Sequence, residues 1–267
     1  MNESKGTSIE QLIKVMKRLR HPTEGCPWDR EQTFSSVAPY TVEEAYEVED
    51  AIARNDLDAI REELGDLLLQ IVFHARMAEE AGHFDFDAVA ESVTRKMIER
   101  HPHVFGEENQ RTQDFHSEAW EEQKTRERQA KSGDTKRILS DVAASLPSLM
   151  RSGKLIKRAM RAGCDPTTPE TVLEQLQEKI PKAPVSGVDD VVQKKDRENW
   201  FGETLFLISH LARQMKVDTE RVLRESNRTF EKRFEQLENQ QIKGHTGIKA
   251  LSLEEWMGLY QSPMDTS

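Results

Sequence analysis

Glycine and proline are scarce in this chain, and long stretches of it contain neither residue. The 267 residues include 13 glycines and 10 prolines. These two residues most often end helices and form tight turns, so their scarcity favours long helices over short strands joined by turns. Apolar residues recur at helical spacing in several of these stretches, for example in 8–20 and 57–81. The sequence therefore predicts an all-α fold.

Residues that cap or stop helices divide the chain into separate elements. In the first half we expect helices over 8–20, from near Thr41 to Asn55, over 57–81 before Gly82, and from Asp85 to just before Pro102. In the second half we expect helices at about 145–162, 171–180, 196–215 and 218–240. Residues 121–137 are almost wholly polar, which is typical of a helix tail and a linker.

Charge and composition exclude several classes of protein. The formal net charge of −10 argues against a general nucleic-acid-binding surface. The two cysteines, Cys26 and Cys164, imply no disulfide framework, so we expect a reducing cytoplasm. The sequence contains no run of about 18 apolar residues, so we expect no transmembrane helix and no membrane partner. The first residues lack the apolar core of a secretory signal.

The two halves of the chain resemble each other. GCPWD at 25–29 and GCDPT at 163–167 are followed by helices in the same order. LGDLLLQIVFHARMA at 64–78 also resembles FGETLFLISHLARQM at 201–215. We interpret this as a tandem duplication with a drifted second copy. The predicted domains are 1–130 and 145–267, joined by a polar linker at 131–144.

Four carboxylates are the most informative residues of the first repeat: Glu44, Glu47, Glu63 and Asp66. Each pair has i,i+3 spacing and shares one helix face. Both helices meet at a short turn around Asn55, and the two pairs lie at matching separations from it. At a rise of about 1.5 Å per residue, an antiparallel hairpin brings all four to one level. Such a cluster needs neutralisation by raised pKa values or bound cations, and all-oxygen ligands favour Mg²⁺, with Mn²⁺ as a substitute.

Other interpretations of these residues stay open at this point. Thr41 and Glu44 fit a capping box, and acidic pairs on one helix are often ordinary surface residues. A di-iron bundle would require Glu-x-x-His pairs, which neither acidic pair provides. His74, two turns beyond Asp66, is either a neighbour of the metal ligands or a plain helix residue.

Two cations and two tryptophans complete the candidate site. Lys96 and Arg100 are four residues apart, on the same helical side as Val93, and would pair with the acidic cluster or with substrate phosphates. Trp28 and Trp120 would stack on a nucleobase or serve as packing residues. Histidines flank Pro102, but we interpret this proline as a helix stop rather than part of a zinc site. The sequence contains no Walker-type glycine-rich loop.

Several ordered segments of the first half resemble MazG-type nucleoside triphosphate pyrophosphohydrolases. They are CPWDREQT (26–33), YTVEEAYEVEDAI (40–52), EELGDLLLQIVFHA (62–75), FDFDAV (84–89) and KMIERHPHVF (96–105). The resemblance implies an all-α, usually dimeric enzyme that hydrolyses (d)NTP to (d)NMP and pyrophosphate. It implies that Glu44, Glu47, Glu63 and Asp66 bind Mg²⁺, that Lys96 and Arg100 contact the triphosphate, and that Trp120 lies near the nucleotide.

The second half resembles the second repeat of tandem family members, from LPSLMRSGKL (146–155) to FEKRFEQLE (230–238). The positions expected for metal ligands are here Gln175, Glu178, Trp200 and Glu203. Thr229 stands where a lysine is expected, and Arg233 is kept. We therefore expect the first repeat to be the active one and the second to be a structural or regulatory partner.

These observations predict a magnesium-dependent NTP pyrophosphohydrolase that acts in nucleotide-pool housecleaning and forms a homodimer. Two alternatives remain from the sequence alone. The chain could be a non-catalytic helical scaffold derived from such an enzyme, or an enzyme restricted to one base.

Overall fold

The computed structural model describes residues 6–106, 138–140, 142–185, 191–243 and 251–260. Every regular element within these ranges is a helix, and none of them is a β-strand. This confirms the predicted all-α class. In the same ranges, no helix combines the length and the apolar character needed to cross a membrane. Trp120 lies outside the described residues, as does most of the predicted polar linker at 131–144.

The chain divides into two compact units, Met1–Ala130 and Lys131–Ser267, which we call unit 1 and unit 2. The helices of unit 1 are α1 (Ser8–Leu19), α2 (Pro27–Glu31), α3 (Phe34–Arg54), α4 (Leu57–Glu80), α5 (Phe86–Arg100) and α6 (Pro102–Phe105). The helices of unit 2 are α9 (Ser148–Arg161), α10 (Pro169–Lys179), the 3₁₀ turn η1 (Ile180–Lys182), α11 (Val191–Gln214), α12 (Thr219–Lys243) and α13 (Leu253–Tyr260).

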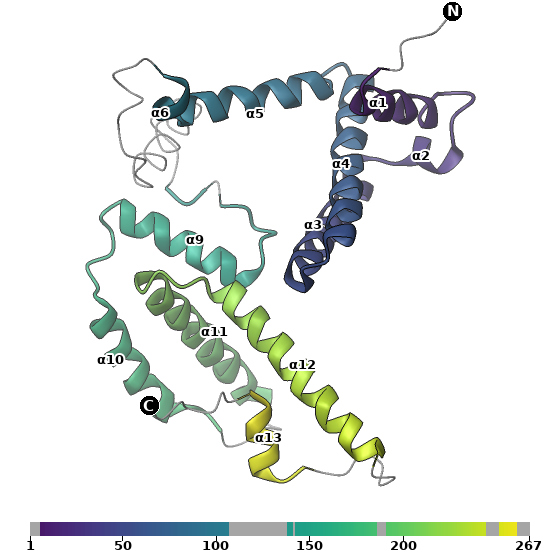
Figure 1. The fold of residues 1–267 in the computed structure, drawn as a ribbon. Helices are drawn as coiled ribbons and strands as arrows, with labels where there is room; N and C mark the ends of the chain where they lie inside the picture. The colour runs from purple at the N-terminus through teal and green to yellow at the C-terminus, as the bar shows by residue number, and fades with distance from the viewer. Residues whose placement is uncertain (1–5, 107–137, 141, 186–190, 244–250, 261–267) are drawn as a thin grey trace, which may run out of the picture. The chain divides into compact units, whose positions relative to one another are not determined.

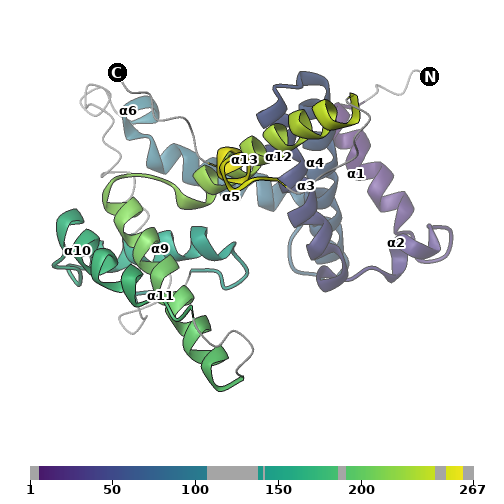
Figure 2. The ribbon, with the colours of Figure 1, turned by 90° about the horizontal axis from the view of Figure 1, so that it is seen from below.

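Unit 1 is built around the antiparallel hairpin of α3 and α4, which lie side by side in both ribbon views (Figures 1 and 2). Asn55 ends α3 in the left-handed conformation, with φ of 55°, and Asp56 caps α4 by accepting from the Ala59 N–H. Asparagine tolerates this conformation better than most residues. A tight turn thus fixes the register of the hairpin.

The core of unit 1 lies where α1 crosses the far half of this hairpin. Met16 from α1, Val37 from α3, and Val72, Phe73 and Met77 from α4 are buried together. The carboxylate positions lie on the other half of α4, nearer the turn. The core therefore holds the hairpin at one end and leaves its other end accessible.

The prediction that the second helix begins near Thr41 was wrong. Helix α3 begins at Phe34, because Thr33 caps it in a box with Ser36, and the helix continues through Pro39. Proline removes one backbone hydrogen bond, a loss that a long, well-packed helix absorbs. Thr41 consequently lies inside α3, where its hydroxyl bonds the Val37 carbonyl at 3.4 Å, so it caps nothing.

The apolar stripe predicted on α4 is only half buried. Ala75 and Ala78 lie in the interior, whereas Leu64 and Ile71 are exposed in the single chain, with Leu68 between them. Likewise α5 contains no buried residue, and Val93 is exposed. Phe86, at the start of α5, packs partly buried against the core of unit 1, but among the described residues nothing buries the side of α5 that carries Val93. Figure 1 shows α5 running away from the end of α4.

Unit 2 repeats part of this plan. Helices α10 and α11 pack against each other, and α9 packs against α11 and α12. Ile156, Val172 and Leu176 are buried there. The sequence did not predict α13, which packs on α12 through an edge contact between Trp256 and Phe230.

Candidate metal centre

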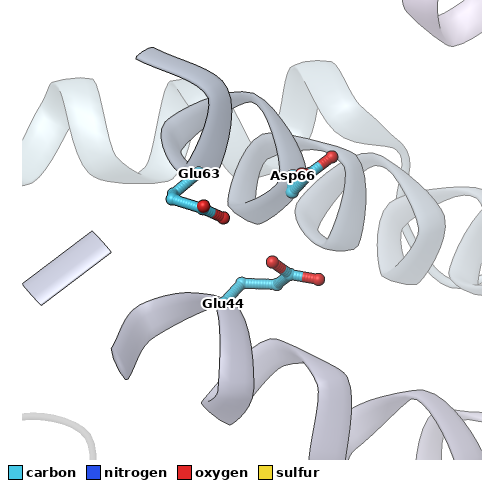
Figure 3. Close-up of side chains that lie close together, drawn as sticks. All are labelled: Glu44, Glu63 and Asp66. Carbon is cyan, nitrogen blue, oxygen red and sulfur yellow. The ribbon is translucent and has the colours of Figure 1, made fainter. Parts of the chain in front are cut away.

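Three carboxylates converge between α3 and α4. Glu44 comes from α3, and Glu63 and Asp66 come from neighbouring turns of α4; one oxygen of each lies within 4.8 Å of the others. Figure 3 shows the three side chains lying close together, with Glu44 on one helix and Glu63 and Asp66 on the other. Glu44 and Glu63 are half-buried and Asp66 is exposed. The hairpin register set at Asn55 thus brings together acidic residues about twenty positions apart in sequence.

Mutual repulsion and burial shift the protonation of this cluster. The pKa of Glu44 is raised by burial and by the negative charges of Asp66 and Glu47. The pKa of Glu63 is raised by partial desolvation and by the charges of Glu47 and Asp66. Glu47 is exposed and stands outside the group of three converging oxygens, yet its charge acts on both neighbours. The cluster therefore gains stability from any positive charge placed within it.

The donor set suits a hard divalent cation. All three converging groups offer carboxylate oxygens, and no histidine or cysteine of the described residues joins them. Oxygen-only ligands favour Mg²⁺ or Mn²⁺ over zinc, copper or iron. Gln70 donates to the Oε1 of Glu44 at 3.4 Å and orients that side chain.

The predicted cations do not reach this cluster within one chain. Lys96 and Arg100 lie near the C-terminal end of α5, which leaves α4 at the end opposite the hairpin turn (Figure 1). In the described part of the chain, no ion pair joins either cation to the four carboxylates. Both side chains are half-buried. The helices of one chain therefore do not bring the two predicted cations to the carboxylates.

Two aromatic side chains meet at Tyr40, one helical turn before Glu44. The Trp28 and Tyr40 rings meet edge to face, with centroids 6.4 Å apart, and both are exposed. Tyr40 precedes Glu44 by four residues and so lies on the same helix face. His74 stacks on Phe34 and bonds the Thr41 hydroxyl at 3.0 Å, and burial lowers its pKa. His74 thus contacts α3 residues rather than the acidic cluster.

Comparison with known proteins identifies the family. Residues 32–105 match the MazG nucleotide pyrophosphohydrolase domain, a range that includes the four carboxylates and both cations. The chain is 41% identical over 261 residues to the nucleoside triphosphate pyrophosphohydrolase of Escherichia coli K12, covering 96% of this chain and 98% of that protein. This chain belongs to the MazG family. It is also 35% identical over 249 residues to the Thermotoga maritima nucleoside triphosphate pyrophosphohydrolase/pyrophosphatase MazG, covering 93% and 92% of the two chains.

Membership of the MazG family confirms the predicted family and enzyme class. It favours the hydrolase over the non-catalytic scaffold that the sequence alone left open.

In unit 2 of this MazG protein, the corresponding residues are arranged differently. The Nζ of Lys179 lies 2.6 Å from the Oε2 of Glu203, and the Trp200 indole N–H donates to the Lys179 carbonyl at 3.2 Å. Gln175 and Glu178 are exposed. The described residues of unit 2 contain no group of three converging His, Cys, Asp or Glu ligands. Arg233 donates to the Gly258 carbonyl at 3.1 Å and helps to hold α13.

Sequence reasoning missed three residues that shape these MazG sites. Tyr40 and Lys179 could have been found from their i,i+4 spacing to Glu44 and Gln175. Arg20, which organises the loop bearing Trp28, carried no such signal, because its partners are backbone carbonyls and a residue sixty positions away.

Proposed function

We propose that this chain hydrolyses nucleoside triphosphates to nucleoside monophosphates and pyrophosphate, with Mg²⁺ held by unit 1, in nucleotide-pool housecleaning. One observation carries the proposal: three carboxylate oxygens from two helices lie within 4.8 Å of one another, in a chain of the MazG family. Mn²⁺ has the same preference for oxygen ligands and substitutes for Mg²⁺.

Glu44, Glu63 and Asp66 would hold the metal, with Glu47 beside them. When bound, the ion would neutralise triphosphate charge and act as a Lewis acid toward the attacking water. Glu47 is exposed and its charge acts on Glu44 and Glu63, so we propose that it accepts the proton of that water. Glu44 is positioned by Gln70 and serves as a ligand from the opposite helix.

Trp28 and Tyr40 would contact the nucleobase. Tyr40 lies one helical turn, about 6 Å along α3, from Glu44. A nucleotide whose phosphates lie at Glu44 can therefore place its base against these two exposed rings. Stacking on aromatic faces tolerates any base, since every base has a π-face. Trp120 lies outside the described residues, and its role near the nucleotide stays a prediction.

A second copy of the chain would complete the site. Leu64, Leu68 and Ile71 form an exposed apolar stripe on α4, and α5 lacks buried residues. A homodimer would cover both surfaces and allow Lys96 and Arg100 of one copy to reach triphosphate bound to the other. Leu68→Lys should then give a monomer by light scattering, with activity reduced at least about tenfold. A dimeric, fully active Leu68→Lys variant would contradict this arrangement.

Unit 2 would be a diverged, non-catalytic copy of unit 1. Gln175, Glu178, Trp200 and Glu203 stand at its ligand positions, and Lys179 supplies a positive charge directly to Glu203. The two repeats would span residues 1–130 and 145–267.

The decisive experiment measures pyrophosphate release from a panel of NTPs and dNTPs with Mg²⁺. Wild type is compared with Glu63→Gln and with the matched unit 2 variant Glu203→Gln. We expect Glu63→Gln to lose at least about 100-fold in turnover and Glu203→Gln to stay within about twofold of wild type. Loss confined to Glu203→Gln would move the active site to unit 2. The panel also distinguishes a broad enzyme from one restricted to a single base.

A further inference from the structure

The short helix α2, which carries Trp28, is not held by apolar packing. Helix α2 has no buried residue. An open pocket of about 680 Å³ lies beside it, lined by Pro27 and Arg30 of α2, Arg20 and Pro22 before it, and Arg76 and Glu80 of α4. Some other interaction must fix the position of the Trp28 ring relative to the hairpin.

Arg20 provides that interaction. Its side chain is only 8% exposed. Its Nη1 donates to the carbonyl of Asp29, the residue after Trp28, and also to the carbonyl of Gln32 at 3.3 Å. Gln32 ends α2 and donates its side-chain amide to the Trp28 carbonyl at 2.9 Å. Two backbone carbonyls that follow Trp28 are thus tied to one guanidinium.

The guanidinium is itself fixed to α4. Its Nε and Nη2 contact the Glu80 carboxylate, the latter at 2.7 Å, and its carbon lies 5.3 Å from the centroid of the Phe73 ring. Arg76 also donates to Glu80, at 2.9 Å. The two arginines hold the pKa of Glu80 below its usual value, so the carboxylate stays charged. Such charge-assisted, two-point contacts are strong and directional.

The turn leading into α2 is equally constrained. A Cβ on Gly25 would lie 2.3 Å from the Leu19 carbonyl oxygen, a distance that only glycine permits. The Gly25 N–H donates to His21 and the Cys26 N–H donates to Leu19, at 2.9 and 2.8 Å. The backbone therefore returns on itself directly after Arg20, which places α2 within reach of its side chain.

We infer that Arg20 is a positioning residue for nucleotide binding. By linking α4 to α2, it fixes the Trp28 ring beside Tyr40. This inference rests on the proposed contact between Trp28 and the nucleobase. It predicts that loss of the Arg20 bonds weakens recognition of the base while the phosphate end of the site is unaffected.

The test compares four variants of the full chain: Arg20→Gln, Arg20→Lys, Trp28→Ala and Arg76→Gln. Arg76→Gln is the matched control, because it also removes a guanidinium from Glu80 but releases no loop carbonyl. Arg20→Lys preserves a charge for Glu80, which supports folding, but cannot reach both carbonyls as the planar guanidinium does. For each variant, KM and kcat for an NTP are measured beside the inhibition constant of inorganic tripolyphosphate, which has no base.

We expect both Arg20 variants and Trp28→Ala to raise KM about tenfold, with kcat within about twofold of wild type. The inhibition constant of tripolyphosphate should not change, and Arg76→Gln should behave as wild type. The double variant Arg20→Gln/Trp28→Ala should be no worse than Trp28→Ala, since both changes remove one interaction.

Three results for the Arg20 variants would overturn the inference. They are an unchanged KM in both Arg20 variants, additive effects in the double variant, and a parallel rise in the tripolyphosphate inhibition constant. An unchanged KM in Trp28→Ala would also overturn it by removing the contact that Arg20 is said to position. None of these results affects the proposed chemistry at Glu63, whose own variant tests that separately.

Discussion

Two helical hairpins of this protein, α3–α4 in unit 1 and α10–α11 in unit 2, carry polar residues at corresponding positions and neutralise their charge differently. In unit 1 three carboxylates face one another without a cation from the described part of the chain. In unit 2 the α11 positions that correspond to Glu63 and Asp66 hold one carboxylate, Glu203, and Lys179 binds it. The carboxylate charge on a hairpin of this kind can thus be neutralised by an external cation or by a lysine of the hairpin itself.

The segments that precede these hairpins share one backbone support but differ in one exposed ring. In unit 1 Arg20 donates to the Asp29 carbonyl, and in unit 2 Gln214 donates at 3.1 Å to the carbonyl of Thr167, the corresponding residue. Both units therefore hold the same backbone position with a side-chain donor. Trp28, however, corresponds to Pro166 in unit 2. The support for this backbone position is present in both units, whereas the exposed ring is present only in unit 1, as the proposed absence of nucleotide contacts in unit 2 requires.

Reciprocal substitution at the first ligand position should give the largest difference between the hairpins. Glu44→Gln should weaken Mn²⁺ binding by about 10- to 100-fold, because it removes a charged oxygen ligand. Gln175→Glu should create no new site, since Lys179 already compensates the charge on α11. Calorimetric titration of both variants measures this. A new stoichiometric Mn²⁺ site in Gln175→Glu would show that unit 2 is one substitution away from binding metal.

The two units should also differ in their response to acid. Asp165 in unit 2 accepts from the Thr167 backbone and hydroxyl and lies 2.7 Å from the His210 ring, and its pKa falls to about 2 from an ordinary 3.8. Because the folded-state pKa is depressed, the stabilisation is present above about pH 4 and is lost as the pH falls toward 2. Asp165→Asn should destabilise unit 2 by about 2 kcal/mol at neutral pH and flatten this dependence. Hydrogen exchange of α11 peptides against pH measures both effects. Equal acid sensitivity in wild type and Asp165→Asn would contradict the assignment.

The parts of this structure that local spacing determines were predictable from the sequence. The matched separations of Glu44 and Asp66 from Asn55 placed them at one level, because a tight turn leaves an antiparallel hairpin no other register. The start of α3 was not predictable in this way, since Pro39 resembles a helix boundary and only the cap at Thr33 overrides it.

Contacts between distant elements were harder to predict. The helical wheel placed Lys96 on the apolar side of α5, but the wheel does not reveal which molecule covers that side. Lys179 and Arg20 were missed for a related reason. Each makes its decisive contact with another element, and a single sequence gives no measure of such contacts.

Stability without metal should respond differently to loss of a carboxylate in the two hairpins. The raised pKa of Glu63 means that its ionised form is disfavoured in the folded state, so Glu63→Gln should stabilise unit 1 when divalent cations are chelated. The expected upward shift in melting temperature is on the order of 1 °C, and it should vanish or reverse with Mg²⁺ present. Glu203→Gln removes the partner of Lys179 and should not stabilise unit 2. Hydrogen exchange of α4 and α11 peptides separates the two responses, and a destabilised, chelated Glu63→Gln would argue against repulsion in the cluster.

The smallest expected effect concerns the Lys179–Glu203 pair itself. The Glu203 side chain is 68% exposed, so solvent screens the pair even though Lys179 is largely covered. A double-mutant cycle with Lys179→Met and Glu203→Gln should give a coupling of about 0.5 kcal/mol, which disappears in 1 M salt because the Debye length is then about 3 Å. Turnover should stay at the wild-type value in all three variants, since the pair lies outside the proposed active unit. If Lys179→Met instead made unit 2 more stable on addition of Mn²⁺, the lysine alone would be excluding metal there. The difference between the hairpins would then depend on one side chain rather than on the lost carboxylates at positions 175 and 200.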